Sequence, residues 1–265
     1  MHKLARRVRF SVNPFLSEEM LGSNSFASKP AGDGLSVFLE LSIEVAGDVE
    51  PSTGFVVNVS DIDKNARQFV VPIFAERIKA DFQQGKHIGL CDIAELLRSA
   101  WSQLADKFGK ARLCKLSLKL NPFREIAIES KDFTMTYFSE KFEFAATHKL
   151  WNDSFSQQRN FEVFGKCANP AGHGHNYVVE VTIKKLSGGN EFCIGDFEKI
   201  VHEELIRIID HKNLNIDVAE FERNNPTVEN IATFVWNKLA GKFGEATLHC
   251  ITVWETDRTY CSYYG

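Results

Sequence analysis

The residues with the clearest capacity for chemistry lie close together in the second half of the chain. Residues 164–177 read FGKCANPAGHGHNY, a segment that holds Cys167 and then His173 and His175 with one glycine between them. We expect a strand over 178–185 directly after this segment. Successive side chains of a strand point to opposite faces, so the two imidazoles share one face with Tyr177 and with the alternate apolar residues that follow.

Two imidazoles on one face can converge on a single metal ion. Zinc accepts neutral imidazole, and a catalytic zinc site has three protein ligands and one open position. We expect the third ligand to be His148, which ends another alternating run over 142–148. An isolated His-x-His pair can also arise by coincidence on a surface or in a core. Cys167, the neighbouring glycines and the third histidine favour a metal site.

Further polar residues stand near the ends of the predicted elements. Asp210 and His211 close one helical run, and Thr227 and Glu229 open another. Each pair has a purely structural explanation, because a histidine suits a helix C-terminus and Thr-x-Glu is ordinary capping chemistry. Glu255 differs, since it interrupts an apolar strand face where an unpaired carboxylate is costly. We expect Glu255 to have a cationic or amidine-like partner.

The chain repeats itself at an offset of 135–140 residues. The segment PAGHGHNYVVEVTI at 170–183 matches PAGDGLSVFLELSI at 30–43, and LAGKFGEA at 239–246 matches LADKFGKA at 104–111. In the first copy Asp33 replaces His173, Leu35 replaces His175, and Ala27 stands opposite Cys167. The apolar alternation survives in the first copy while the polar constellation is lost. We therefore predict two copies of one unit, over 1–131 and 132–265, of which only the second is catalytic.

Each copy is expected to run strand, strand, helix, helix, strand, strand. In the second copy we predict strands over 136–148 and 178–185, with a polar loop over 152–160 between them. A helix capped by Asp196 and another capped by Thr227 should follow, and then strands over 247–255 and to Tyr264. The first copy should have a strand over 35–45, helices near 62–74 and 93–108, and strands near 113–120 and 125–129. This pattern predicts an α+β fold with helices on one face of an antiparallel sheet.

Composition limits the possible functions. The chain has 265 residues, of which 44% are hydrophobic and 25% charged, as in an ordinary globular protein. A net charge of −4 gives no global basic surface, so we expect no nucleic-acid partner. We expect no membrane partner, because no apolar run approaches the ~18 residues of a membrane helix. The basic start lacks the apolar stretch of a secretory signal, and the six scattered cysteines indicate reduced thiols in the cytoplasm.

Together these motifs closely resemble the 6-pyruvoyltetrahydropterin synthase family. The resemblance rests on 164–177 and on three later segments, IDHKNLN at 209–215, PTVENIA at 226–232 and VWETD at 253–257. It covers about 138–264, and the first half resembles the same fold only through the internal repeat. The resemblance implies the tunnelling fold, in which two tandem ββααββ units contribute antiparallel sheets to an oligomeric barrel. Because sheet edges must be paired or covered, a homo-oligomer is expected.

The resemblance also implies roles for the polar residues. His148, His173 and His175 would bind zinc (Zn²⁺), and Cys167 would be the catalytic base with Asp210 and His211 as a proton relay. Glu255 would hold the guanidine-like edge of a pterin, with help from Thr227 and Glu229. The implied reaction converts 7,8-dihydroneopterin triphosphate to 6-pyruvoyl-tetrahydropterin with loss of triphosphate. Nearby cations should lower the pKa of Cys167, and Lys149, Arg159 and Lys166 are candidates to steer the triphosphate.

Three alternatives remain at this stage. A 6-carboxytetrahydropterin synthase of the queuosine pathway would share the fold and the zinc, although that branch usually has Cys-x3-His-Gly-His where this chain has Cys-x5-His-Gly-His. A tandem enzyme of uricase type would pair two such units in one chain. A binding or scaffold protein would have lost chemistry in both copies. An assembly of six ββααββ units would contain three of these two-unit chains, whereas a uricase-like assembly would contain four chains.

Overall fold

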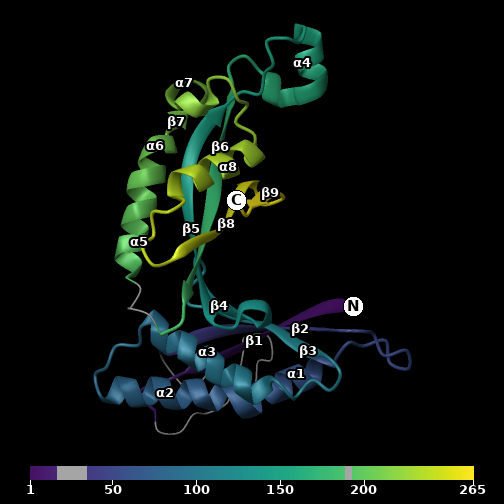
Figure 1. The fold of residues 1–265 in the computed structure, drawn as a ribbon, viewed down its shortest axis with the longest axis vertical. Coiled ribbons are helices and arrows are strands. Elements are labelled where there is room, and N and C mark those ends of the chain that lie inside the picture. The colour runs from purple at the N-terminus through teal and green to yellow at the C-terminus, as the bar shows by residue number, and fades with distance from the viewer. Residues whose placement is uncertain (17–34, 189–192) are drawn as a thin grey trace. The chain divides into compact units, whose positions relative to one another are not determined.

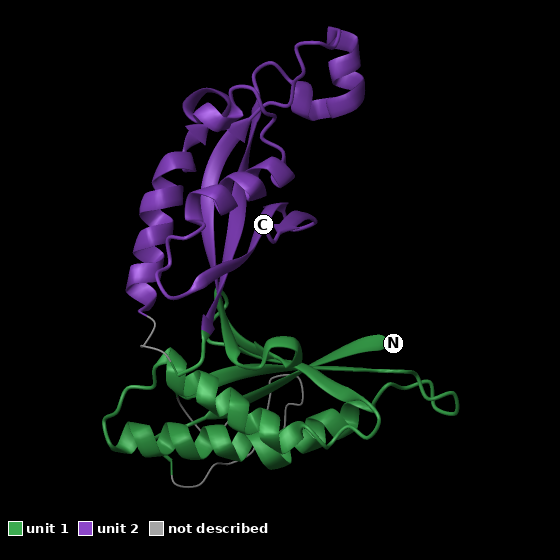
Figure 2. Ribbon diagram, viewed as in Figure 1, with its two compact units in different colours: residues 1–138, 186–192 green, residues 139–185, 193–265 purple. Residues whose placement is uncertain are grey.

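The computed structural model describes residues 1–16, 35–188 and 193–265, and the chain divides into two compact units (Figure 2). Unit 1 comprises Met1–Phe138 with Leu186–Phe192, and unit 2 comprises Ser139–Lys185 with Cys193–Gly265. The predicted residues at 30–34 and Ala27 lie outside the described part of the chain. Helices and antiparallel strands occur in both units, which confirms the α+β class.

Unit 1 is a four-stranded antiparallel sheet of order β1-β2-β3-β4 with helices between its two hairpins (Figure 1). Its elements are β1 (His2–Val12), β2 (Val37–Gly47), α1 (Val59–Asn65), the π-helical turn η1 (Ala66–Val70), α2 (Val71–Gln83), α3 (Leu90–Leu104), β3 (Arg112–Lys119), β4 (Arg124–Glu129) and the 3-10 turn η2 (Ser130–Asp132). Asn58 begins α1, because its side chain accepts a hydrogen bond from the backbone N–H of Ser60.

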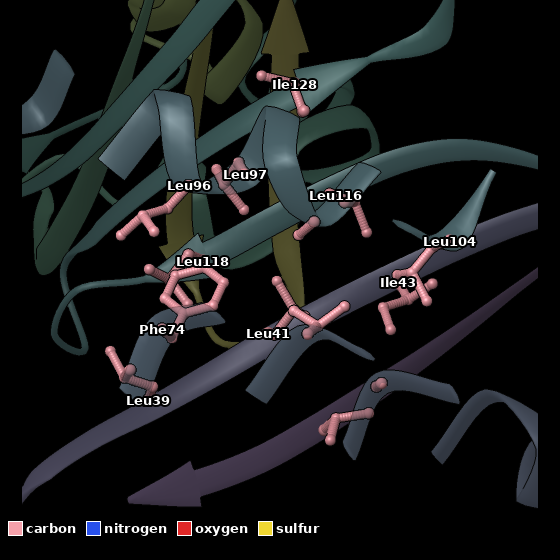
Figure 3. Packing of buried hydrophobic residues seen from close by; sticks show 14 of the residues in the cluster. Leu39, Leu41, Ile43, Phe74, Leu96, Leu97, Leu104, Leu116, Leu118 and Ile128 are labelled. Atoms are coloured by element: carbon pink, nitrogen blue, oxygen red, sulfur yellow. The ribbon is translucent and has the colours of Figure 1, made fainter. Parts of the chain in front are cut away.

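Strand β2 contributes to the core of unit 1 through side chains that are alternately buried and more exposed. Leu39, Leu41, Ile43 and Val45 on β2 are buried, and the residues between them on β2 are more exposed up to Glu44. Figure 3 shows these leucines and Ile43 packed with leucines from α3 and β3. The same predicted face was expected to include Leu35 and Val37. Those two side chains are 89% and 41% exposed, so the buried stripe begins only at Leu39.

Unit 2 has the strand order β5-β6-β8-β9, with the short β7 parallel to β5 (Figure 1). Its elements are β5 (Met135–His148), α4 (Gln157–Phe164), the 3-10 turn η3 (Gly165–Ala168), β6 (His173–Leu186), α5 (Ile194–Val201), the π-helical turn η4 (His202–Ile206), α6 (Arg207–Ile209), β7 (Lys212–Asn213), α7 (Leu214–Asp217), the 3-10 turn η5 (Ala219–Phe221), α8 (Val228–Leu239), β8 (Thr247–Thr256) and β9 (Thr259–Tyr263).

The apolar face of β6 is part of the buried core of unit 2. Tyr177, Val179, Val181 and Ile183 are at most 1% exposed, as their alternation predicted. Strand β8 extends this face, since Val179 pairs with Val253 and Val181 with Ile251. Helix α8 then packs on β8 and β9 through its predicted apolar stripe, whose buried members are Ile231, Phe234, Val235 and Leu239.

Three details of unit 2 and unit 1 differ from expectation. The predicted polar loop over 152–160 contains the start of α4, which Ser156 caps by accepting from the N–H of Arg159. Helix α5 begins after Cys193, so Asp196 lies in its first turn and is not the cap. The basic N-terminal segment forms strand β1, in which cationic and apolar residues alternate. For α4 and β1, polar residues concealed a regular element, whereas for α5 only the position of the cap differs.

The strands do not close into a barrel within the described residues. The strand order ends at β1 on one side and at β9 on the other, which leaves both strands with one unpaired edge. No helix in the described part of the chain combines the length and the apolar character that crossing a membrane requires.

Candidate functional site

Three histidines meet where β5 ends and β6 begins. His148 Nε2 lies 3.1 Å from His173 Nε2, and one ring nitrogen from each of His148, His173 and His175 lies within 4.8 Å of the others. His148 is 1% exposed, and the other two are partly buried. Adjacent antiparallel strands bring the three rings together, because the last residue of one strand lies beside the first residues of the next.

The carbonyl of Pro226 sets the ring state of His148. His148 Nδ1 lies 2.8 Å from this oxygen and 3.5 Å from the hydroxyl of Tyr177. A carbonyl only accepts hydrogen bonds, so Nδ1 carries the proton and Nε2 directs its lone pair at the other two rings. Histidines that ligate metals usually have this arrangement, with the second nitrogen held by a backbone carbonyl or a carboxylate.

The three histidines fit a zinc ion. At Zn–N distances of 2.0–2.1 Å, two ligands of a tetrahedral ion are separated by roughly 3.3 Å, and His148 and His173 are 3.1 Å apart. Among the described residues, His175 Nε2 is buried without a hydrogen-bond partner, which is costly unless a ligand fills the gap. Burial lowers the pKa of His148 and of His175. Both rings are therefore neutral near pH 7, as metal ligation requires.

Gly172 allows the two strands to approach closely at the cluster. Its φ is +71°, and a Cβ at this position would lie 2.9 Å from the carbonyl oxygen of His148. Both facts exclude other residue types without a backbone shift. The glycine in PAGHGH is therefore a structural requirement for the approach of the loop to His148.

Glu255 lies beside the histidine cluster, and its charge influences Cys167. Glu255 Oε1 is 3.5 Å from His148 Nε2 and 3.6 Å from His175 Nε2, and its side chain is 21% exposed. Cys167 lies in η3, and its carbonyl accepts from the N–H of Leu150 at 2.9 Å. Burial and the Glu255 carboxylate raise the pKa of the Cys167 thiol. The expected lowering of this pKa by Lys166 and His211 is therefore not found, because burial and the Glu255 carboxylate both act to raise it.

Asp210 and His211 are bound to strand β5 through Ala145. The Asp210 carboxylate accepts from the N–H of Ala145 at 2.9 Å, and the N–H of His211 donates to the carbonyl of Ala145 at 2.6 Å. The Ala145 hydrogen bond lowers the pKa of Asp210, which also pairs with His211 Nδ1 at 2.9 Å. Among the described non-glycine residues, only His211 has a positive φ, at 55°. Such strain often accompanies function.

A cavity of about 460 Å³ has His211 and one member of the histidine cluster, His175, in its lining. It is lined by Ala145, Ala146, Thr147, Gly174, His175, Asn176, His211, Lys212 and Asn213. His175 and His211 therefore face one hollow although β6 and the α6–β7 turn are separate segments. The cavity is the space in which a small molecule could contact both groups.

The two remaining predicted site residues, Thr227 and Glu229, lie at the start of helix α8. Thr227 caps α8 by accepting from the N–H of Asn230 at 3.4 Å, and it follows the Pro226 carbonyl that holds His148. Glu229 is exposed in the first turn of α8. The pKa of Cys261 on β9 is raised mainly by burial and secondly by the negative charge of Glu229. The structure therefore places Glu229 beside Cys261.

The three predicted cationic residues are occupied or solvated. Lys149 Nζ lies over the ring of Trp151 at 5.2 Å, Arg159 pairs with Glu162 at 3.3 Å, and Lys166 is exposed.

The polar residue that matters most around Lys149 is Asn215, which sequence reasoning missed. Its side chain accepts from the N–H of Lys149 at 2.7 Å and donates to the carbonyl of Lys149 at 2.9 Å. A backbone clasp of this kind has no sequence signature.

Comparison with known proteins identifies the second half of the chain. The family model described as 6-pyruvoyl tetrahydropterin synthase matches residues 137–265. The human 6-pyruvoyl tetrahydrobiopterin synthase is 36% identical over 130 residues, which are 48% of this chain and 90% of that protein. The 6-carboxy-5,6,7,8-tetrahydropterin synthase of Aquifex aeolicus is 28% identical over 156 residues, or 47% of this chain and 95% of that protein.

A solved structure is also similar. The 6-pyruvoyl tetrahydropterin synthase of Caenorhabditis elegans has a TM-score of 0.45 and 30% identity, and the match covers 49% of this chain and 96% of that one. The family model and the human relative both fall on the segment that carries the three histidines, Cys167 and Glu255. The chain therefore belongs to the 6-pyruvoyl tetrahydropterin synthase family.

Proposed function

We propose that this chain is a zinc-dependent carbon–oxygen lyase that converts 7,8-dihydroneopterin triphosphate to 6-pyruvoyl-tetrahydropterin with loss of triphosphate, and that it acts in the cytoplasm. The observation that carries the proposal is the convergence of three imidazoles, with His148 and His173 nitrogens 3.1 Å apart. The names of the relatives support the pterin chemistry. A metal held there would act as a Lewis acid on side-chain oxygens of the substrate.

Cys167 is proposed to remove the carbon-bound protons. In the free protein burial raises its pKa, so the thiol needs a cation or a proton acceptor nearby to react. The proposed relay partner is His211, which Asp210 holds by its Nδ1 at 2.9 Å. A carboxylate that orients an imidazole stabilises its protonated form. The strained backbone at His211 supports a role for this residue beyond folding.

Glu255 is proposed to bind the pterin, with Thr227 and Glu229 as further substrate residues. A carboxylate can accept two parallel hydrogen bonds from an amino-pyrimidine edge, as it does from a guanidinium group. Glu255 is partly buried, and its oxygen lies 3.5–3.6 Å from two of the histidines. Binding there would hold the pterin side chain beside the proposed metal.

Product identification tests the proposed reaction. Zinc-loaded protein incubated with dihydroneopterin triphosphate should release triphosphate and form 6-pyruvoyl-tetrahydropterin, detected by mass spectrometry. Cys167→Ala should lose at least 10²-fold in rate, the lower range for a general base, and should keep its zinc. A wild-type protein that binds zinc but leaves the substrate intact would contradict the proposal.

A second candidate product follows from the Aquifex relative, whose name is 6-carboxy-5,6,7,8-tetrahydropterin synthase. The same substrate and one water would then yield 6-carboxy-tetrahydropterin, acetaldehyde and triphosphate, as in the queuosine pathway. The longer Cys-x5-His spacing and the higher identity to pyruvoyl-forming relatives favour the first product. Acetaldehyde release in the same assay would identify the second.

We further propose that 1–131 is a degenerate, non-catalytic tunnelling-fold unit and 132–265 the synthase unit. Both halves contain two strands, then helices, then two strands, which supports a duplication. The open edges of β1 and β9 support assembly into a homo-oligomeric barrel. Such an assembly would satisfy the backbone groups that each free edge leaves unpaired.

A further inference from the structure

The cavity that His175 and His211 line is bordered mainly by residues to which no catalytic role has been assigned. His175 and His211 line one part of it, and the rest consists of Thr147, Asn176, Lys212 and Asn213 around small residues. These four polar side chains project from the ends of β5 and β6 and from β7. Their position next to the proposed catalytic groups raises the question of what they bind.

The floor of this cavity lacks bulky side chains. It is formed by Ala145, Ala146 and Gly174, which leave space directly over the backbone of β5 and β6. A Cβ at Gly174 would lie 3.3 Å from Thr147 Cγ2, a tight contact that would also narrow the hollow. The cavity is therefore wide enough for a polar group of several heavy atoms.

The charge of the cavity is uncompensated. No acidic residue is among its lining residues, and in the described part of the chain Lys212 takes part in no ion pair. Two carboxylates close to Lys212 in the chain are engaged, because Asp210 is held by Ala145 and His211 and Asp217 accepts from the N–H of Asn213 at 2.8 Å. Glu255, whose Oε1 lies 3.6 Å from His175 Nε2, belongs to the histidine cluster. The side chain of Lys212 is thus available to an external anion.

A cavity in unit 1 provides the contrast. This hollow of about 180 Å³ also contains cations, including Arg7, Lys115 and Lys119. Each of them has a carboxylate within 4.0 Å: Glu40 lies near Arg7 and Lys119, and Glu125 lies near Lys115. Cations paired with carboxylates in this way attract an anionic ligand only weakly. The charge of Lys212 is not compensated by a carboxylate in an ion pair, so it attracts an anion more strongly.

We propose that Lys212, with donors from Asn176, Asn213 and Thr147, binds the triphosphate tail of the substrate and stabilises it as it leaves. The inference rests on the proposed function and extends it to a site for the leaving group. Asn213 Oδ1 accepts from the N–H of Asn215 at 3.1 Å, which leaves its amide NH₂ as a donor. A lysine is a suitable point charge for phosphate oxygens, and negative charge grows on the leaving oxygen as its bond to carbon breaks.

This assignment replaces Lys149, Arg159 and Lys166 as the main phosphate contacts. Arg159 already has a carboxylate partner, Lys149 lies over Trp151, and Lys166 is on an exposed turn. Lys212 is better placed because its backbone is fixed by the pairing of β7 with Ala146 on β5, and because it follows His211 directly. The anion would therefore lie beside the proposed proton relay.

The test compares Lys212→Ala, Lys212→Arg and Lys212→Glu in the full-length, zinc-loaded protein. Lys212→Ala should raise both the KM for dihydroneopterin triphosphate and the inhibition constant of inorganic tripolyphosphate about 10-fold, the loss of one charge-assisted hydrogen bond. Lys212→Glu should raise them further, and Lys212→Arg should stay close to wild type. The inhibition constant of dihydroneopterin, which has no phosphate, should not change.

Lys199→Ala is the matched control, because it removes an exposed lysine from the last turn of α5 in the same unit. Equal tripolyphosphate inhibition in wild type and Lys212→Ala, or an equal loss in Lys199→Ala, would overturn the inference while leaving the proposed function intact. If the wild type does not turn over the substrate, the proposed function fails, and calorimetry with tripolyphosphate still decides this site. Weaker tripolyphosphate binding by Lys212→Ala than by the wild type would support the Lys212 site. No binding by the wild type, or equal binding by both proteins, would refute it.

Discussion

His148 carries its ring proton on Nδ1, because the Pro226 carbonyl 2.8 Å away can only accept. The opposite nitrogen therefore points into the cluster as a lone pair. Burial lowers the pKa of His148 and His175, so protons compete poorly with a metal for these rings near neutral pH. The nearby Glu255 carboxylate adds a negative charge that favours a cation in the same space.

Replacing a histidine of the cluster should abolish stable zinc binding. His148→Ala, His173→Ala and His175→Ala each remove one of three ligands, and even outer partners of such ligands change affinity 10–100-fold. We expect zinc content to fall from about one per chain to near zero, measured by inductively coupled plasma mass spectrometry after gel filtration. His202→Ala, on the exposed side of η4, should retain its metal. Retention of full zinc by all three variants would exclude this site.

At the scale of elements, the site depends on how loops are attached to the ends of strands. Asn215 in α7 holds the backbone of Lys149 by two hydrogen bonds, and Asn225 accepts from the N–H of Trp151 at 2.8 Å. The chain after His148 is therefore held from α7 and from the segment before α8. Gly172 brings the start of β6 within contact of His148. These contacts fix the directions of the histidines more firmly than the strand pairing alone.

Gly172→Ala should disrupt the site, whereas Gly188→Ala should not. Both glycines have a positive φ, +71° and +79°, so both substitutions carry a similar backbone cost of about 1–2 kcal/mol. A Cβ at Gly172 additionally meets the His148 carbonyl at 2.9 Å, whereas Gly188 has nothing within 4 Å. We expect only Gly172→Ala to lose zinc affinity, measured by competition with a chelating dye. Equal affinities in the two variants would show that the close approach has no effect on the ligands.

At the scale of the molecule, the two units share an order of elements but differ in chemistry. The described residues contain one group of three potential ligands, and it lies in unit 2. The polar face of the unit 1 sheet carries a network of ion pairs, in which Glu40 lies near Arg7, Arg9 and Lys119. Burial of Glu40 is outweighed by these cations, which lower its pKa. These pairs therefore bring opposite charges together on this face of the unit 1 sheet.

The full chain should be an oligomer with about one zinc per chain. Strands β1 and β9 each have an unpaired edge, and pairing them between chains would satisfy those backbone groups. Native mass spectrometry should show three chains if six units assemble, or four if the assembly resembles uricase. A monomer at micromolar concentration would contradict the proposed barrel. Two zinc ions per chain would contradict a degenerate first unit.

Sequence alone determined the features that depend on local spacing. The alternation after His175 predicted which face of β6 is buried, and Thr227 was correctly recognised as the cap of α8. The grouping of His148 with His173 and His175 was also predicted, with His148 chosen because it ends the alternating run over 142–148. Strand periodicity is a property of the backbone, so it can be read without knowledge of distant contacts.

Only the tertiary structure decided the features that join distant segments. Pro226, which orients His148, is 78 residues away from it along the chain and acts through a backbone oxygen that every residue type has. Helix α4 was concealed by its polar surface, and the free charge of Lys212 depends on which carboxylates other segments engage. The segment 164–177 thus specifies which atoms could bind a metal, while contacts with β5 and the loop before α8 determine where those atoms point.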